Sequence, residues 1–302
     1  RRQRQMCIRD RNVTAGFNIN FNRGKVDKLA DNVTGLYGTE WATSSTFPKS
    51  DYVLKEGRPV GLVRGLTADG FYTTDDFTYA NGVYTLKEGV ADVSSAVFPN
   101  YHLHNGMNER PAGQLAYPGM AKFKDLNDDG IINDDDVDVI GDMTPVHTGG
   151  FNINATYKNF DLGLYFNWSY GNEIYNVNKL AALYGYKEGA VYENKLSIVK
   201  DCYKIYDVVN GELVALTTPE QLNAANANAK LPLAYSENGY VSTLGIEDGS
   251  YLRLNTLTLG YTLPKSMLQK AGISNLRVYG SIYNVFTITG YSGIDAEVST
   301  ST

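Results

Sequence analysis

An acidic segment in the middle of the chain has the residue spacing of a calcium-binding loop. Counted from Asp125, oxygen-bearing side chains stand at positions 1, 3, 5 and 9, Gly130 stands at position 6, and another acid stands at position 12. Hard Ca²⁺ ions need about six to eight oxygen ligands, and the EF-hand loop supplies them with this spacing. The predicted ligands are Asp125, Asn127, Asp129, the backbone carbonyl of Ile131, Asn133 and Asp136.

The loop departs from the EF-hand pattern at its end. Asp136 replaces the usual Glu, which shortens the reach of the last ligand. Gly141 and Pro145 follow closely and leave no room for a full exit helix. We therefore expect a weak, structural Ca²⁺ site that fixes a loop, and the alternative is an acidic turn capped by its own Asp and Asn side chains.

The other chemistry-bearing residues do not form a catalytic pattern. The sequence has no H-E-x-x-H, P-loop or G-x-S-x-G motif, so we do not expect an enzyme. His102 and His104 are two residues apart without a third metal ligand nearby, which favours a solvated loop. Lys and Arg number 27 against 33 Asp and Glu, and the net charge of -6 argues against a nucleic-acid partner.

Period-two alternation of apolar and polar residues indicates the elements that hold these motifs. It predicts β-strands over 12–22, 151–157, 160–170, 251–262 and 276–288, with a tight turn at Lys158-Asn159 and a turn with a short helix at 263–275. Leu252 and Leu254 are in the opposite phase from Leu257 and Leu259, which indicates a bulge near Asn255 or mixed burial.

The lengths of these elements favour a membrane barrel. Strands of about 10 to 12 residues match a tilted membrane span, and the connections alternate between short turns and the very long stretches 23–147 and 171–249. Outer-membrane barrels have short periplasmic turns and long external loops. The predicted fold class is all-β, as part of a large antiparallel transmembrane β-barrel with long extracellular loops. The sequence contains no run of about 18 apolar residues, so it does not predict a membrane-spanning helix.

The first eleven residues stand apart from this pattern. Residues 1–11 are rich in arginine, do not begin with Met, and resemble translated sequencing-adapter sequence. We expect them to be an artefact, and we expect residues 12–302 to be a partial barrel.

Several motifs stand in a fixed order along the chain. They are 123–132, 150–152, 157–162 and 170–176, followed by 249–254, 257–264, 276–279, 284–287 and 291–297. In this order they resemble the SusC/RagA family of TonB-linked outer-membrane proteins of Bacteroidota. The resemblance extends from Asn12 to Val298, with Ala296 where the family usually has Pro.

The resemblance implies a function and partners. Members form a 22-stranded barrel closed by an N-terminal plug and import oligosaccharides or peptides as TonB-dependent receptors in the Gram-negative outer membrane. The implied partners are a SusD-like surface lipoprotein, TonB-ExbB-ExbD through the missing N-terminal part, a glycan or peptide ligand, and membrane lipid. The plug and the family's last strand are absent from this sequence, so we expect a barrel fragment.

Two other functions fit parts of the pattern. A soluble β-rich carbohydrate-binding module could carry a dockerin-like calcium loop, although dockerins have two such loops and this chain has one. A surface barrel without transport activity, such as an adhesin, is the second alternative. A plug encoded upstream would exclude that alternative.

Aromatic and amide side chains after the 160–170 strand form a candidate substrate surface, because aromatic rings stack on sugars and amides bind hydroxyl groups. Its members are Asn172, Tyr175, Asn176, Tyr184 and Tyr186, with loop packing or contact with the lipoprotein as alternatives. We expect Asn18, Asn20, Asn152, Asn154 and Asn167 to face the barrel lumen. We expect Phe160, Trp168, Tyr170 and Tyr261 to lie near membrane interfaces.

Overall fold

A computed structural model of the chain describes residues 11–39, 42, 46–98, 110–183, 196–234, 239–269 and 272–297. It forms two compact units. The sheet unit comprises Arg1–Gly24, Thr144–Ile174 and Asp248–Thr302, and the insert unit comprises Lys25–Met143 and Tyr175–Glu247. No helix in the described part is long and apolar enough to cross a membrane. His102, His104, Tyr184 and Tyr186 lie outside the described residues.

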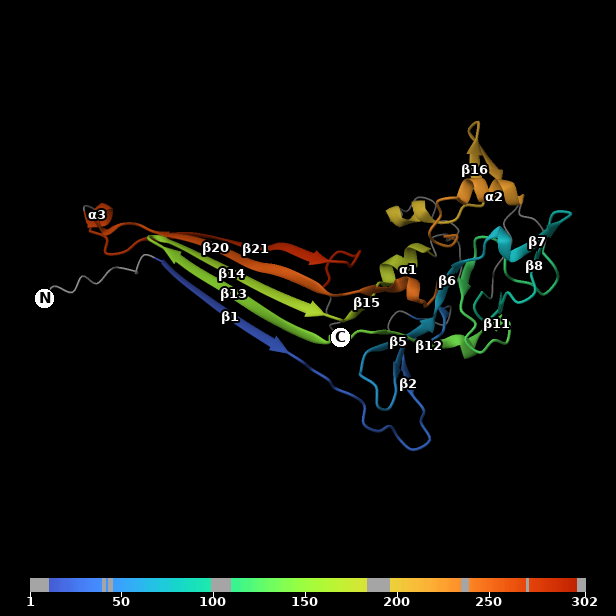
Figure 1. Ribbon diagram of the computed structural model, residues 1–302, viewed down its shortest axis with the longest axis horizontal. Coiled ribbons are helices and arrows are strands. Elements are labelled where there is room, and N and C mark those ends of the chain that lie inside the picture. Colours follow the sequence, from blue (N-terminus) through green and yellow to red (C-terminus); the bar gives the residue numbers. More distant parts are fainter. Residues whose placement is uncertain are drawn as a thin grey trace. The chain divides into compact units, whose positions relative to one another are not determined.

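The sheet unit is built on one five-stranded antiparallel sheet in the order β1-β13-β14-β20-β21 (Figure 1). These strands confirm the five predicted from alternation. Arg11, among the residues set aside above, pairs with Tyr157 as the first residue of β1. The strands are β1 (Arg11–Asn20), β13 (His147–Tyr157), β14 (Phe160–Tyr170), β20 (Tyr251–Thr262) and β21 (Arg277–Thr289).

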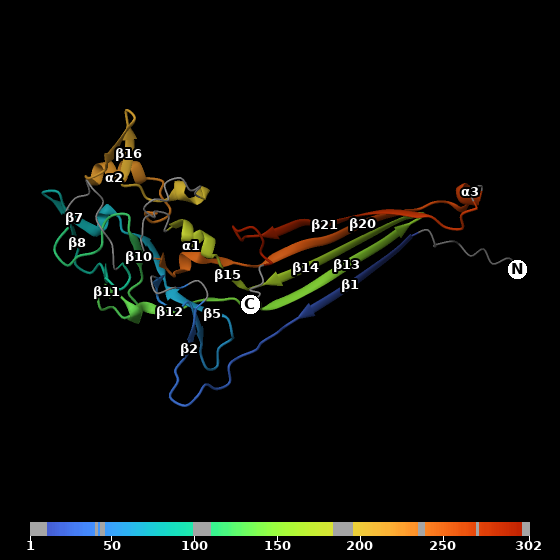
Figure 2. The ribbon, with the colours of Figure 1, turned by 180° about the vertical axis from the view of Figure 1, so that it is seen from behind.

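Both short connections lie at the same end of this sheet (Figures 1 and 2). Tyr157 pairs with Phe160 across the predicted two-residue turn, where Lys158 has a φ of +54°. The second connection contains α3 (Lys265–Leu268) and, after it, Gly272, whose φ of +69° favours glycine. The predicted tight turn and short helix are therefore confirmed.

The strand register gives the sheet one apolar and one polar face. Phe17 pairs with Phe151 and Phe151 with Phe166, and one residue along, Asn18 pairs with Gly150 and Gly150 with Asn167. Because side chains alternate along a strand, every residue paired in this way shares a face with its partners. Apolar side chains on the first face remain exposed, including Val13 at 69% and Leu259 at 52%.

A bulge at Asn255 keeps β20 in phase with its neighbours. Leu254 pairs with Phe166, whereas Thr256 pairs with Tyr165, so Asn255 is the extra residue. The pairing with β21 shifts at the same place, where Asn284 has a φ of +50°. Because one extra residue reverses the alternation, Leu252 and Leu254 lie on the same face as Leu257 and Leu259. The bulge predicted from the leucine phases is confirmed.

The insert unit is made of the two long connections, which the alternation analysis treats only as loops. It contains α1 (Val177–Leu183), α2 (Pro219–Asn226) and many short strands. The strands are β2 (Leu36–Gly38), β3 (Thr46–Phe47), β4 (Tyr52–Leu54), β5 (Leu62–Leu66), β6 (Ala68–Phe71), β7 (Phe77–Ala80), β8 (Val83–Leu86), β9 (Asp92–Val93), β10 (Ala121–Phe123), β11 (Ile131–Ile132), β12 (Val137–Asp142), β16 (Tyr206–Val209), β17 (Glu212–Ala215) and β18 (Gly239–Tyr240). Two further strands, β15 (Glu173–Tyr175) and β19 (Ile246–Asp248), pair with each other at the unit boundaries.

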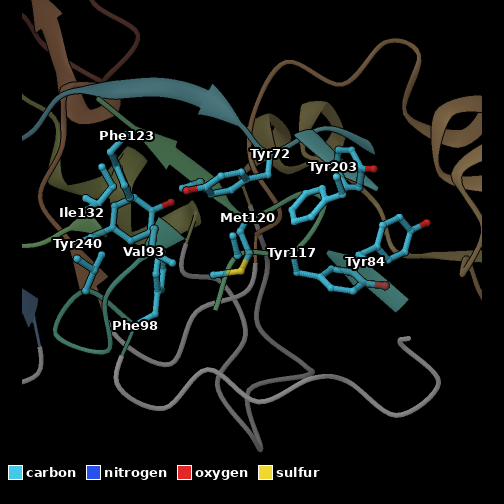
Figure 3. Packing of buried hydrophobic residues seen from close by; sticks show 14 of the residues in the cluster. Tyr72, Tyr84, Val93, Phe98, Tyr117, Met120, Phe123, Ile132, Tyr203 and Tyr240 are labelled. Carbon is cyan, nitrogen blue, oxygen red and sulfur yellow. The ribbon is translucent and has the colours of Figure 1, made fainter. Parts of the chain in front are cut away.

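A tyrosine-rich core joins the two connections (Figure 3). Tyr72, Tyr84 and Tyr117 from the first connection cluster with Tyr203 and Tyr240 from the second. The Tyr72 hydroxyl donates to the Ala91 carbonyl at 2.6 Å, and the Tyr84 hydroxyl donates to the Thr217 carbonyl at 3.0 Å. Burial raises the pKa of both phenols, so they stay neutral donors. Five of the 23 tyrosines in the sequence are therefore buried in this core.

Two hairpins in the insert unit have a sequence signal that the strand search omitted. Asn81-Gly82 joins β7 to β8, and Asn210-Gly211 joins β16 to β17, all four residues having positive φ. Asn-Gly between β-forming residues is a strong hairpin signal, because this turn requires left-handed backbone at both positions. The two dipeptides could have located these strands from the sequence.

Deleting Asn255 should prevent the sheet from forming correctly. Without the bulge, one half of β20 must reverse its faces, which places Leu252 and Leu254 among the polar side chains. We expect the deletion to abolish the heat-modifiable, folded band of the protein on a semi-native gel. The substitution Asn255→Thr keeps the residue count and should preserve that band. A folded band for the deletion would show that the bulge does not set the register.

Candidate ligand-facing wall and calcium loop

The polar face of the sheet carries a set of asparagines seated over glycines of the neighbouring strand. Asn152 on β13 lies over Gly16 on β1, where an added Cβ would come within 2.4 Å of the Asn152 Oδ1 atom. Asn154 lies over Gly163 and Asn18 over Gly150 in the same way, at 3.3 and 3.2 Å. The glycines give the amides room to lie along the sheet, so this face presents uncharged donors and acceptors.

The predicted lumen-facing residues share this polar face. Asn18, Asn20, Asn152, Asn154 and Asn167 all fall on it by register. The Asn167 Nδ2 atom donates to the Tyr251 hydroxyl at 3.3 Å, while its Oδ1 atom is buried without a protein partner in the described part of the chain. A buried amide oxygen without a protein partner is a position that an ordered water would satisfy.

Arg253 on β20 anchors the segment after β21 onto the same face. Its side chain is 8% exposed and donates to the Thr287 hydroxyl at 3.0 Å, to the Glu297 carboxylate at 2.7 Å and to the Asp295 carboxylate. The Glu297 backbone N–H, with help from Arg253, lowers the pKa of Asp295. The sequence motifs contained all three charged residues but did not show that they meet.

The acidic loop folds around its own side chains. The Asp125 carboxylate accepts hydrogen bonds from the backbone N–H groups of Asp129 and Gly130, at 3.2 and 2.7 Å. Gly130 has the positive φ, +84°, that the sharp turn requires, and the Ile131 carbonyl accepts from the Asn133 Nδ2 atom. This conformation fits the turn of a calcium loop, and it also fits an acidic turn closed by its own side chains.

Asp136 closes the loop rather than presenting its oxygens outward. It is fully buried, and its two oxygens accept from the N–H groups of Leu126 at 2.7 Å and Asn133 at 2.8 Å. In the described part of the chain, no three His, Cys, Asp or Glu side chains are arranged to hold a metal ion. Calcium binding by this loop stays a prediction.

The three described members of the candidate substrate surface have roles inside the protein. Asn176 is 5% exposed, and its Oδ1 atom accepts from the Lys179 N–H in the first turn of α1. Tyr175 packs edge-on against Tyr52 at 6.2 Å, and Asn172 accepts from the Ser169 hydroxyl at 2.7 Å. Such contacts are expected if these residues pack the loop, which is the alternative to substrate binding. Tyr184 and Tyr186 lie outside the described residues.

Comparison with known proteins finds similarity to TonB-dependent receptors over nearly the whole chain. The chain is 29% identical over 305 residues to TonB-dependent receptor P3 of Formosa agariphila, an alignment covering 98% of the chain and 25% of that receptor. It is 30% identical over 184 residues to TonB-dependent receptor P26 of the same organism, covering 60% of the chain and 16% of the receptor. No protein-family model matches the chain.

Solved structures share the fold. A structure of the RagAB peptide transporter matches with a TM-score of 0.59 and 21% identity, over 95% of this chain and 25% of that one. The RagAB peptide importer in its closed-closed state matches with a TM-score of 0.60 and 20% identity, over the same shares of both chains. The resemblance predicted from the motifs is confirmed, and the chain spans about a quarter of the length of receptor P3.

Calcium binding can be tested with two aspartates of the same loop. If the loop binds Ca²⁺, isothermal calorimetry of the protein should give a binding heat that Asp125→Ala removes, because Asp125 occupies the first ligand position. Asp135→Ala removes an exposed charge outside the predicted ligand set and should leave that heat nearly unchanged. Absence of heat in the unaltered protein, or equal heats in both variants, would establish the self-capped turn instead.

The Arg253 anchor predicts a measurable coupling. In a double-mutant cycle, Arg253→Met and Glu297→Gln should show a coupling free energy of about 1 kcal/mol, because the guanidinium is buried while the carboxylate is half exposed. Arg253→Met and Asp161→Asn should be additive, since Asp161 pairs with Arg277 at the other end of the same sheet.

The same anchor predicts a pH dependence. Since the pKa of Asp295 is lowered, its pairing contributes fully above the ordinary aspartate pKa and is lost as the pH falls through the lowered value. A cycle between Arg253→Met and Asp295→Asn, measured by urea unfolding, should therefore lose its coupling in acid. A coupling of the same size at every pH would contradict the ion pair.

Proposed function

We propose that this chain, which resembles TonB-dependent receptors over nearly its whole length, forms part of the barrel wall and external region of an outer-membrane importer. The observation that carries the proposal is the two-faced sheet. Its exposed apolar face suits contact with lipid, and its asparagine-rich face suits contact with a water-filled lumen. The polar residues on that second face are mainly uncharged.

Aromatic side chains at both ends of the apolar face support a membrane position. Near the short turns, Phe160 and Tyr261 have ring centroids 4.7 Å apart, and at the other end Phe17 stacks on Trp168 at 5.4 Å. Eight residues separate Phe160 from Trp168, or about 26 Å at a rise of about 3.3 Å per residue. This is close to the height of about 25 Å typical of the apolar band on outer-membrane barrels, with aromatic girdles at both edges.

The asparagine-rich face supports an uncharged polar oligomer as substrate. Amide groups pair with peptide groups and with sugar hydroxyls, so oligosaccharides and peptides both fit this chemistry. The RagAB structures are named as those of a peptide transporter or importer. That likeness supports peptides as one substrate class and a surface lipoprotein as the partner.

The complete receptor would supply the remaining functional parts. In this proposal, segments outside the chain provide the plug and the contact with TonB-ExbB-ExbD, and the insert unit lies on the external side, where a SusD-like lipoprotein binds. Recovering the full reading frame tests this directly. A plug encoded upstream and a SusD-like neighbouring gene would support the importer, and a reading frame without a plug would favour a barrel that does not transport.

The two faces should respond differently to a charge. Leu164→Arg places arginine at the middle of the apolar face and should cost about 2–4 kcal/mol of folding stability in the bilayer. Tyr165→Arg places the same charge on the polar face, one residue along, and should leave folding nearly intact. The measurement is urea unfolding of the receptor in vesicles, with outer-membrane fractionation of the cells. A receptor recovered in the soluble fraction would refute the membrane assignment.

Transport can be measured in cells that lack the receptor gene. We expect loss of growth on one class of oligosaccharide or peptide, with restoration by the intact gene and not by a version whose TonB-binding segment is deleted. Growth restored by both versions would contradict TonB-dependent import.

A further inference from the structure

A hollow of about 550 Å³ lies on the apolar face of the sheet, at the end away from the short turns. Apolar and aromatic side chains from all five strands line it, among them Phe17, Phe151, Trp168, Leu252 and Ile288. Its middle lies over β13, β14 and β20, each of which has a paired strand on both sides. The hollow is therefore not produced by an unpaired edge of the sheet.

Gly149, which has no side chain, leaves room for the Trp168 ring that lines the hollow. The Trp168 ring crosses β13 above Gly149, where an added Cβ would lie 2.4 Å from the Trp168 Cζ2 atom. This position lets Trp168 stack on Phe17 of β1, with ring centroids 5.4 Å apart. The ring therefore lies along the sheet, leaving space beside it over Leu252 and Ile288.

A polar donor stands at the rim of this apolar space. The Trp168 indole N–H donates to the His147 Nδ1 atom at 3.1 Å, which places the proton of the neutral imidazole on Nε2. His147 also lines the hollow and stacks on Tyr170 at 5.0 Å. The site therefore combines an apolar floor with a hydrogen-bond donor at its edge.

We propose that this hollow binds one acyl chain of a membrane phospholipid, with an oxygen of the lipid's ester or headgroup accepting from the His147 Nε2–H. This inference rests on the proposed membrane position of the sheet. Three observations select a lipid: the hollow opens on the apolar face, it lies at the level of the outer aromatic group, and its donor stands at the rim. A lipid has this arrangement of an apolar chain below a polar oxygen.

The test uses the full-length receptor, delipidated in detergent and titrated with a saturated-chain phosphatidylethanolamine. Native mass spectrometry should detect one lipid that stays bound after the others dissociate. Leu252→Trp fills the hollow and should lower its occupancy about ten-fold, through the loss of acyl-chain contacts. Leu259→Trp adds the same ring to the same face of β20, outside the hollow, and should leave occupancy unchanged.

Two further variants complete the experiment. His147→Phe keeps an aromatic ring but removes the donor, and should weaken the retained lipid about ten-fold or less. If Leu252→Trp fails to give a heat-modifiable folded band, Ile288→Trp fills the same space from β21.

Equal retention in the filling variants and in Leu259→Trp would overturn the proposal, since only general annular lipid would then be bound. A receptor that retains no lipid, or a second protein bound at this face, would overturn it as well. Substrate uptake separates the two proposals. Filling the hollow should leave uptake intact, whereas loss of membrane insertion in the unaltered receptor would refute the proposed function itself.

Discussion

The inter-strand register of the five long strands is the constraint on which the sheet depends. Side chains alternate across each strand, so a slip of one residue would exchange the asparagines and leucines between faces. The bulge at Asn255 keeps residues 251–254 of β20 on the same faces as the paired residues of β14, and β21 shifts its pairing at the same position. One extra residue thus determines whether the sheet has one apolar face or two mixed ones.

The polar face is organised by close packing as well as by polarity. Asparagines lie over glycines of the adjacent strand, and Arg253 holds the segment after β21 against the same face through two carboxylates. The amides are fixed in direction because their neighbours leave room on one side only. A wall of this kind presents oriented, uncharged hydrogen-bonding groups, which suits recognition of polar oligomers better than charge alone.

The insert unit is formed by two connections that are far apart in the sequence and that must pack against each other. Tyrosines from both connections share one core, and the hydroxyls of Tyr72 and Tyr84 donate to backbone carbonyls. Tyrosine suits this position because its ring is apolar while its hydroxyl satisfies a carbonyl that would otherwise be buried alone. The acidic loop belongs to this unit, and its buried Asp136 joins the two ends of the loop to each other.

The sequence by itself determined the strands of the sheet, both short turns, the bulge and the resemblance to TonB-dependent receptors. These features depend on local alternation, on turn residues and on motifs, which can be read along the chain. The Asn-Gly hairpins were equally local and could have been found. Only the tertiary structure decided that the long connections share a core, that both carboxylate oxygens of Asp136 accept from backbone N–H groups, and that Asn176 is buried. The meeting of Arg253 with Asp295 and Glu297, and the passage of Trp168 over Gly149, were also invisible in the sequence. These contacts join residues on different strands or connections, and the local pattern of a chain does not record which distant segment becomes a neighbour.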